Sequence, residues 1–312
     1  MKHSKDPKRS SMNILFRADS SSSIGTGHIM RDLVLAKKYP NDNVIFAVRE
    51  LDGNINHKID KSSYKKVILK TNDIKELNKL IKKLKIDLLI IDHYEIDYSF
   101  EKKLKEKIPS LKILSFDDTY EKHYCDILLN HNIYADKKKY KDLVPKKCEL
   151  RCGAKYTLLR DEFIKEKKKK RKKTSTKIKT IFIAMGGADH SNINIPILKV
   201  LKKFKGLKIN LVTTTANKNL EELKQYSKNR SWINLHVNSN KIAKLMNKSN
   251  LAIVTPSVTV NEVYFMNIPL ISIKTADNQR DMYKYLKKNK HLVLKKFNKN
   301  KLFKKLQNLG LK

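Results

Sequence analysis

Short apolar runs, each separated from the next by an amphipathic stretch, follow one another along almost the whole chain of 312 residues. In one intervening stretch, residues 74–84, the apolar residues recur at the spacing of an α-helix. Strand-like runs that alternate with helices predict parallel sheets covered by helices on both faces, an α/β fold. The expected strands are residues 14–16, 44–48, 67–69, 88–91, 113–116, 127–129, 178–185, 209–213, 233–237, 251–254 and 270–273.

The alternation is interrupted by the charge run KEKKKKRKK at residues 165–173. Such a run is normally solvated and makes a natural linker. Because the second half repeats the plan of the first, we predict two Rossmann-like domains that face a cleft. The expected parts are a leader or tag at 1–11, a first domain at 12–164, a basic linker at 165–177 and a second domain at 178–312. One helix of the second domain is expected to follow Asn240, an N-cap candidate.

The stretch RADSSSSIGTGH at residues 17–28 follows the first strand and precedes a helix-like segment. It holds two of the eight glycines of the chain, Gly25 and Gly27. Ligands of open α/β sheets bind outside the carboxyl ends of the strands, where this loop would lie. His28, at the boundary of loop and helix, can exchange a proton near neutral pH. The loop is therefore a candidate catalytic segment.

A second glycine pair, Gly186 and Gly187, ends the first strand of the second half. Glycines there let a backbone approach an anion, and the next helix offers unpaired amides, although a plain turn explains the pair equally well. Glu262 follows a later strand and can accept the hydroxyls of a ribose, or can simply stabilise a helix start. The segment DNQ at 277–279 also follows a strand. These loops predict a nucleotide site.

Polar residues also end two strands of the first half, at 92–94 and 117–118. A glycosidase with paired carboxylates would use Asp19 with Asp117 or Asp118. No spacing typical of a catalytic metal site is present, so neither a metal nor another cofactor is expected.

The formal net charge is +38, from 69 Lys and Arg against 31 Asp and Glu. Nucleic-acid or membrane-surface binding is one explanation, and a lysine coat typical of a lysine-rich proteome is the other. The lysines are dispersed and the run at 165–173 holds no aromatic residue, which favours the lysine coat over a nucleic-acid partner. No apolar run approaches the ~18 residues of a membrane span. Three cysteines without a CxxC pair predict free thiols and a cytoplasmic protein.

Several motifs occur together in one order: RADSS, IGTGH and RDL between residues 17 and 33, IDHY at 91–94, FDD at 116–118, CDILLN at 125–130, YTLLRDEF at 156–163, MGGAD at 185–189 and DNQ at 277–279. With them the chain, from about residue 12 to about residue 286, resembles the UDP-sugar hydrolases of pseudaminic acid biosynthesis. That family is similar to the N-acetylglucosaminyltransferase that completes lipid II, and the resemblance implies its GT-B fold.

The resemblance implies hydrolysis of UDP-2,4-diacetamido-2,4,6-trideoxy-β-L-altropyranose to UDP and the free sugar, on a route that leads to flagellin glycosylation. The first domain would be catalytic and the second would bind UDP. Water activated by His28 would attack opposite the leaving UDP and invert the anomeric carbon, without a metal. Apart from the UDP-sugar, no nucleic acid or membrane insertion is expected, and a monomer is compatible with the sequence.

The positions that match the family carry the expected site. His28 is the expected general base. The substrate-binding residues are Arg17, Asp19, Gly25, Thr26, Gly27, Tyr94, Arg160, Asn278 and Gln279, and the nucleotide-binding residues are Gly186, Gly187, Asp189 and Glu262. One departure is the segment TPSV at 255–258, which lacks the glycine often found before the ribose-binding glutamate of related transferases. A GT-B glycosyltransferase that uses a UDP-sugar donor is the alternative function.

Overall fold

The computed structural model describes residues 10–169 and 177–312. The chain forms two compact units, residues 1–158 and 159–312. Most of the expected leader and the centre of the expected linker lie outside the described residues.

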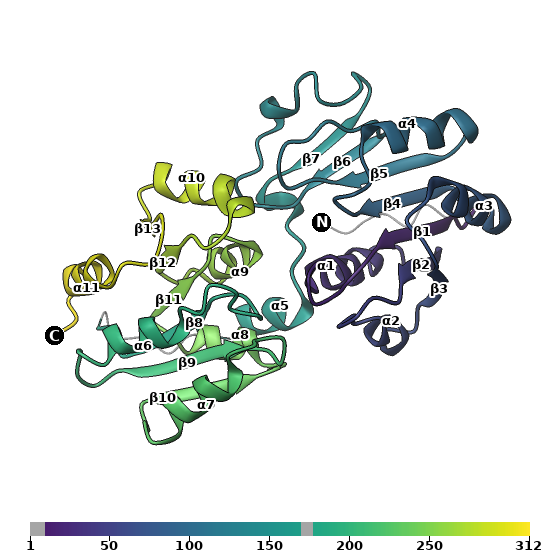
Figure 1. The fold of residues 1–312 in the computed structure, drawn as a ribbon. Coiled ribbons are helices and arrows are strands. Elements are labelled where there is room, and N and C mark those ends of the chain that lie inside the picture. Colours follow the sequence, from purple (N-terminus) through teal and green to yellow (C-terminus); the bar gives the residue numbers. More distant parts are fainter. Residues whose placement is uncertain (1–9, 170–176) are drawn as a thin grey trace. The chain divides into compact units, whose positions relative to one another are not determined.

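The first unit is built on parallel strands joined by crossover helices (Figure 1). Its elements are β1 (Asn13–Ala18), α1 (Gly27–Ala36), β2 (Asn43–Arg49), α2 (His57–Lys61), β3 (Lys65–Leu69), α3 (Ile74–Leu84), β4 (Leu88–Asp92), α4 (Tyr98–Lys107), β5 (Lys112–Phe116), β6 (Ile127–Asn130) and β7 (Glu149–Cys152). The seven strands have the order β3-β2-β1-β4-β5-β6-β7, and every pair is parallel.

The apolar side chains of β1 pack into the hydrophobic cores on both faces of this sheet. Ile14 and Phe16 belong to the core beneath α1 and α2, whereas Leu15 belongs to the core beneath α3 and α4. All three side chains are fully buried, and Phe16 stacks on Phe46 of β2 with ring centroids 4.8 Å apart. Each such side chain stabilises the fold by roughly 1.5–3 kcal/mol. A strand buried on both faces reads as a continuous apolar run, which is why the sequence predicts it well.

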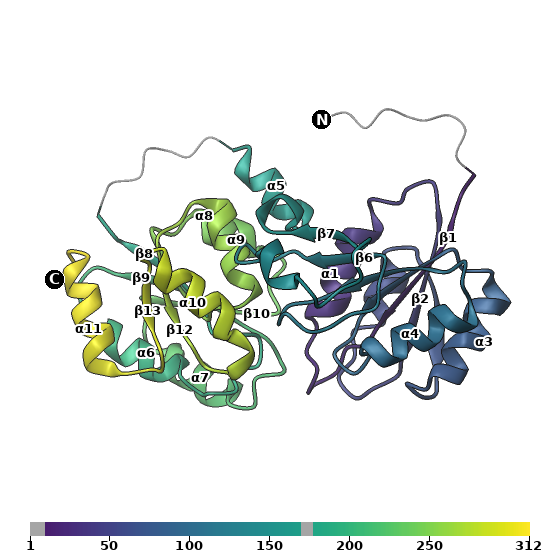
Figure 2. The ribbon, with the colours of Figure 1, turned by 90° about the horizontal axis from the view of Figure 1, so that it is seen from above.

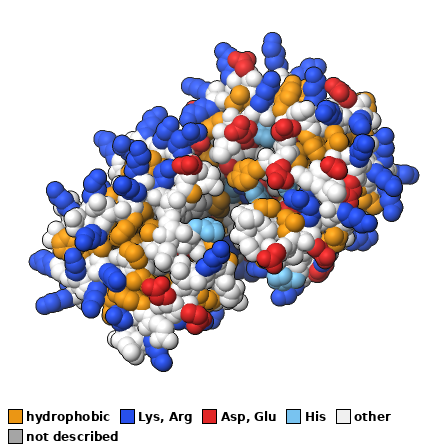
Figure 3. All heavy atoms as spheres, viewed as in Figure 1, with side chains coloured by type: hydrophobic (Ala, Val, Ile, Leu, Met, Phe, Trp, Pro, Cys, Tyr) orange, Lys and Arg blue, Asp and Glu red, His pale blue; other side chains and the backbone are white. Residues whose placement is uncertain are grey.

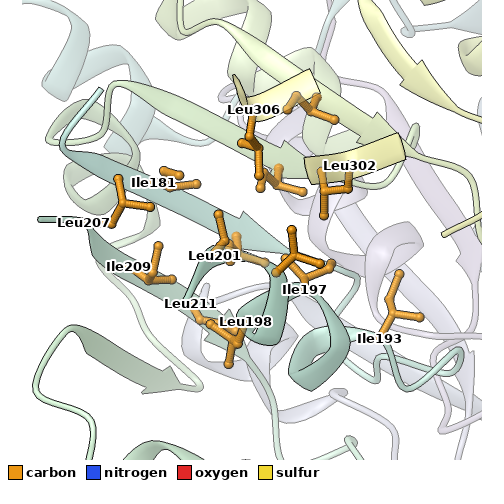
Figure 4. Close-up of a cluster of buried hydrophobic side chains, with 14 of the residues drawn as sticks. Ile181, Ile193, Ile197, Leu198, Leu201, Leu207, Ile209, Leu211, Leu302 and Leu306 are labelled. Atoms are coloured by element: carbon orange, nitrogen blue, oxygen red, sulfur yellow. The ribbon is translucent and has the colours of Figure 1, made fainter. Parts of the chain in front are cut away.

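The second unit repeats this plan (Figure 2). Its elements are α5 (Asp161–Lys167), β8 (Thr180–Ala184), α6 (Asn194–Leu201), β9 (Lys208–Thr213), α7 (Leu220–Lys228), β10 (Ile233–Val237), α8 (Ile242–Asn247), β11 (Leu251–Val254), α9 (Val258–Met266), β12 (Leu270–Ile273), α10 (Arg280–Lys288), β13 (Leu292–Leu294) and α11 (Lys299–Asn308). Its parallel six-stranded sheet has the order β10-β9-β8-β11-β12-β13. Branched side chains from α6, α11 and the strands beneath them form its largest core (Figure 4).

Both units therefore have the strand order of a Rossmann fold, and the expected α/β class with two parallel sheets is confirmed. In this order the connection reverses direction between two central strands, β1 and β4 in the first unit and β8 and β11 in the second. Ligands of such sheets bind at that switch point.

The division between the units differs from the expected boundary at residue 164. Helix α5 packs against α8 and α9, so it belongs to the second unit, which begins at Leu159. A carboxylate oxygen of Glu162 accepts a hydrogen bond from the backbone amide of Ala243 in the first turn of α8, at 3.2 Å. Asn240 is not the N-cap of that helix: Lys241 holds the N-cap position and makes no side-chain capping bond.

A buried ionic cluster joins α4 to the carboxyl end of β5. The ring of His123 contacts Glu101 at 3.1 Å through Nδ1 and Asp117 at 3.0 Å through Nε2. Burial alone would lower the pKa of His123, but the hydrogen bonds to Asp117 and Glu101, together with their charges, raise it to about 10. The imidazolium is therefore the form that the folded protein holds at neutral pH.

We predict that His123→Gln lowers the free energy of unfolding by about 3 kcal/mol near neutral pH, because it leaves two buried carboxylates without their cation. The folded pKa lies above the unfolded value of about 6.5, so the contribution is complete below that value and is lost as pH rises through about 10. Urea unfolding at three pH values across that range measures it, with the exposed His57→Gln as control. A difference that stays constant with pH would contradict the assignment.

Candidate active site

The loop between β1 and α1 holds its own shape. Ser21 and Gly25 exchange backbone hydrogen bonds of 3.3 and 2.8 Å, and the Ser21 hydroxyl accepts from the amide of Ile24 at 2.9 Å. Gly25 has a φ of +85°, a left-handed conformation that glycine adopts without steric cost. The closed loop places Thr26 at the N-cap position of α1 and His28 in its first turn.

His28 is paired with a carboxylate at the switch point of the first sheet. Asp92 is the last residue of β4, beside the end of β1, and its Oδ1 lies 2.6 Å from Nδ1 of His28. A carboxylate only accepts hydrogen bonds, so Nδ1 carries the proton of the neutral ring. Nε2 then holds the lone pair, as a general base requires.

Arg31, one turn after His28 on α1, holds two carboxylates. Its Nε and Nη2 donate to Asp92 at 2.6 and 2.5 Å, and its Nη1 and Nη2 donate to Asp118 at 3.0 and 3.1 Å. The guanidinium also lies 4.5 Å from the ring centroid of Phe116. Two N–H···O bonds from one guanidinium fix the orientation of a carboxylate as well as neutralising its charge.

Arg31 keeps the two carboxylates of this cluster ionised. Burial alone would raise the pKa values of Asp92 and Asp118, but Arg31 keeps both below the ordinary aspartate value, with His28 assisting at Asp92. Two carboxylates and one guanidinium sum to one negative charge. An imidazolium formed at His28 would neutralise it.

Tyr94 lies beside the imidazole. Its hydroxyl donates to Asp118 at 3.0 Å, and its ring meets that of His28 edge to face, with centroids 5.0 Å apart. The side chain is well exposed, at 62%. It therefore combines an anchored hydroxyl with a ring surface that a sugar can contact.

Two residues expected at the substrate lie in the interior of the first unit. Arg17 and Asp19 are both 0% exposed and pair with each other at 2.8 Å. Asp19 also accepts from Arg49 and His93, each at 2.8 Å. The two side chains are therefore buried and paired at the end of β1, and their expected contact with the substrate stays a prediction.

The glycine loop of the second unit is packed against its neighbour. Gly186 has a φ of +79°, and a Cβ at Gly187 would lie 2.8 Å from Cγ2 of Thr214. The hydroxyls of Thr213 and Thr214 donate to the carbonyl of Gly187 at 3.1 and 2.8 Å. Glycine is thus favoured at 186 by its left-handed backbone conformation and at 187 by the close approach of Thr214.

Asp189, which the sequence places at the nucleotide, lies buried at the start of α6, and the expected contact stays a prediction. It is 2% exposed, and its carboxylate accepts from the amides of Ile193 and Asn194, at 3.2 and 3.1 Å, where α6 begins. The carboxylate oxygens of Asp189 therefore accept hydrogen bonds from the first amides of α6, and the side chain caps the N-terminus of that helix.

Glu262 and Arg160 come together, 102 positions apart in sequence. Nη2 of Arg160 donates to Glu262 at 3.2 Å, and Nη1 pairs with Glu162 at 3.0 Å. Burial raises the pKa of Glu262 to about 7, although Arg160 opposes the shift. The carboxylate thus changes charge near neutral pH.

Gln279 closes the loop after β12. Its Oε1 accepts from the amides of Thr275 and Ala276 at 2.7 and 3.2 Å, while Asn278 beside it is exposed. Of the two, Asn278 is the side chain available to a ligand.

The structure thus brings His28 and Tyr94 together around a cluster of three further residues, Arg31, Asp92 and Asp118. These three lie within motifs that the sequence shows, RDL, IDHY and FDD, but their mutual pairing is not visible in the spacing. The signal that could have found Asp92 and Asp118 is a carboxylate at the end of an apolar strand, whereas Arg31 lies within helix α1 and has no such signal.

In residues 10–169 and 177–312, no group of three or more His, Cys, Asp or Glu side chains is arranged to hold a metal ion. Over the same residues, none of the helices has the length and apolarity needed to cross a membrane. Lysine and arginine are scattered over the visible face of both units (Figure 3).

No family model matches the sequence. The chain is 43% identical over 286 residues to the UDP-2,4-diacetamido-2,4,6-trideoxy-β-L-altropyranose hydrolase of Campylobacter jejuni, covering 92% of this chain and all of that protein. It is 32% identical over 289 residues to an uncharacterized protein of Methanocaldococcus jannaschii, of which it spans 59%.

Solved structures show the same fold at low identity. MurG of Acinetobacter baumannii has a TM-score of 0.64 at 12% identity, with 96% of this chain and 91% of that chain covered. The UDP-GlcNAc 2-epimerase of Neisseria meningitidis has a TM-score of 0.59 at 12% identity and the same coverage. By its sequence identity to the Campylobacter enzyme over nearly its whole length, the chain belongs to the family of UDP-2,4-diacetamido-2,4,6-trideoxy-β-L-altropyranose hydrolases.

Proposed function

We propose that this protein hydrolyses UDP-2,4-diacetamido-2,4,6-trideoxy-β-L-altropyranose to UDP and the free sugar, with His28 as the general base. The observation that carries the proposal is the 2.6 Å pair of His28 and Asp92 at the switch point of the first sheet. The 43% identical relative supports the choice of substrate. A cytoplasmic location and a place before flagellin glycosylation are parts of this proposal that come from the family resemblance.

In the proposed reaction, Nε2 of His28 takes a proton from water as the oxygen attacks the anomeric carbon. The bond from that carbon to the diphosphate oxygen breaks on the opposite face, and UDP leaves with the electron pair. The configuration at carbon is therefore inverted. Asp92 and the negative charge of its cluster stabilise the imidazolium, which later returns its proton to solvent. A positioned base of this kind contributes about 10²–10⁴-fold.

The second unit is proposed to bind the UDP portion. Helix α9 begins at Val258 without a side-chain capping bond from Ser257, so its first amides are suited to the diphosphate. Glu262, one turn further, would accept the ribose hydroxyls when ionised, and Gly186 and Gly187 would allow a close backbone approach. With amides facing the phosphates, no metal ion is required by the proposal.

The alternative is a GT-B glycosyltransferase, which the MurG-like fold would also suit. We predict that the purified protein releases UDP from the UDP-sugar in buffer alone, with one free sugar for each UDP, and that EDTA leaves the rate unchanged. Coupled UDP detection and NMR of the sugar anomers measure this and show the first-formed anomer. UDP release only after addition of a sugar or lipid acceptor would favour the transferase.

For the base, we predict that His28→Asn lowers kcat by about 10²–10⁴-fold, because the amide cannot take the proton of water. UDP affinity, measured by calorimetry, should stay within experimental error of wild type. The exposed His57→Asn serves as the matched control. Turnover close to wild type in His28→Asn would show that another group is the base.

For the nucleotide site, we predict that Glu262→Gln weakens UDP binding by roughly tenfold, the cost of one charge-assisted hydrogen bond. Wild-type affinity should improve as pH rises through about 7, because the ionised carboxylate accepts the ribose hydroxyls. The variant shares the titration of UDP itself, so the ratio of the two affinities isolates Glu262. Equal affinities at every pH would place the ribose elsewhere.

A further inference from the structure

Asp32 is a buried carboxyl group that the proposed mechanism leaves unused. It follows Arg31 on α1 and is 0% exposed. Neither of its carboxyl oxygens receives a hydrogen bond from any residue in the described part of the chain. An ionised carboxylate in such a position would be costly, because it is shielded from bulk solvent and no donor of the described residues bonds to it.

The group that faces Asp32 is the carboxylate of Asp92. Two carboxylates cannot donate to each other, so a hydrogen bond between them requires a proton on one. Asp92 is the ionised member, since His28 and Arg31 both donate to it. Arg31 does not donate to Asp32, because its Nε, Nη1 and Nη2 are directed to Asp92 and Asp118.

We propose that Asp32 is a positioning residue of the hydrolase: as a neutral carboxylic acid it donates its O–H to Asp92 and thereby fixes the carboxylate that orients His28. The inference rests on the proposed role of His28 as the base. With this bond, Asp92 accepts from His28, Arg31 and Asp32. Three donors leave the carboxylate one orientation.

The electrostatic setting agrees with a neutral Asp32. Burial, and next the charge of Asp92, raise its pKa well above the ordinary aspartate value, while Arg31 opposes the shift. The remaining titratable groups of the cluster are His28 on α1, Tyr94 after β4, Asp118 after β5 and His131 after β6. Burial, followed by the charge of Arg31, lowers the pKa of His131 to about 4, so His131 is neutral.

A neutral Asp32 also sets the charge that His28 experiences. Arg31, Asp92 and Asp118 then sum to one negative charge, which one imidazolium balances. An ionised Asp32 would make the sum two negative charges, which one imidazolium could not balance.

Two substitutions of Asp32 show whether its side chain acts by donating a hydrogen bond or only by filling space in the core. Asp32→Asn keeps an N–H donor of the same size, and Asp32→Leu removes the donor. We expect Asp32→Asn to keep kcat within about threefold of wild type, and Asp32→Leu to lose about 10–100-fold, as when an outer-shell partner of a functional group is removed. KM should change little in either variant. The exposed Asp60, changed to Asn and to Leu, is the control pair.

The pH profile distinguishes positioning from stability. Without the Asp32 donor, the charge of Asp92 acts more strongly on His28, so the acidic limb of kcat/KM in Asp32→Leu should move to higher pH. The profile of Asp32→Asn should match wild type. Circular dichroism and thermal unfolding of each variant show whether the fold is kept.

Infrared spectroscopy tests the proton even if Asp32→Leu fails to fold. The difference spectrum between wild type and Asp32→Asn at neutral pH should show the carbonyl stretch of a protonated carboxylic acid. Taking the difference cancels the band of Glu262, whose pKa of about 7 leaves it partly protonated in both proteins. An unchanged infrared spectrum, or a folded Asp32→Leu with wild-type kcat and pH profile, overturns the role of Asp32. Retained turnover in His28→Asn instead overturns the proposed base, so the two failures are distinguishable.

Discussion

The forked contact between Arg31 and Asp92 is the interaction on which the rest of the first site depends. It joins the first helix to the end of β4, and through Asp118 it reaches the end of β5. A guanidinium buried to this degree needs carboxylate partners, and each carboxylate needs the guanidinium. His28, Tyr94 and Asp32 each contact one of these two carboxylates, so their positions follow from this single cation.

The two units share one strand order but carry different residues in the loops that follow their strands. In both, polar loops meet at the switch point between the central strands. In the first unit these loops carry a histidine with a paired carboxylate, whereas in the second they carry glycines locked by threonines. The same fold therefore positions both sets of loops, and the residues within each set determine what it can bind or catalyse.

The sequence predicted the buried strands because a short continuous apolar run is typical of a strand that is covered on both faces of a parallel sheet. It did not predict β7, whose residues ELRC are half exposed, or the three-residue edge strand β13. Among the site residues, His28 was visible from its loop. The burial of Arg17 and Asp19 was not, because a charged pair two residues apart looks the same in sequence whether it faces a ligand or the core. The hydrogen bonds that Asp189 accepts from the start of α6 were not visible either, because a capping carboxylate and a ligand-binding one share a loop position.

The packing of α5 has a consequence for how this chain can be divided. Arg160 and Glu162 precede or begin α5, yet they contact Glu262 and the start of α8. A fragment that starts at the second sheet, near residue 178, would lack the cation of Glu262 and the acceptor at α8. A transferable second unit must therefore begin at Leu159, so any exchange of units between related chains would carry α5 with the second sheet.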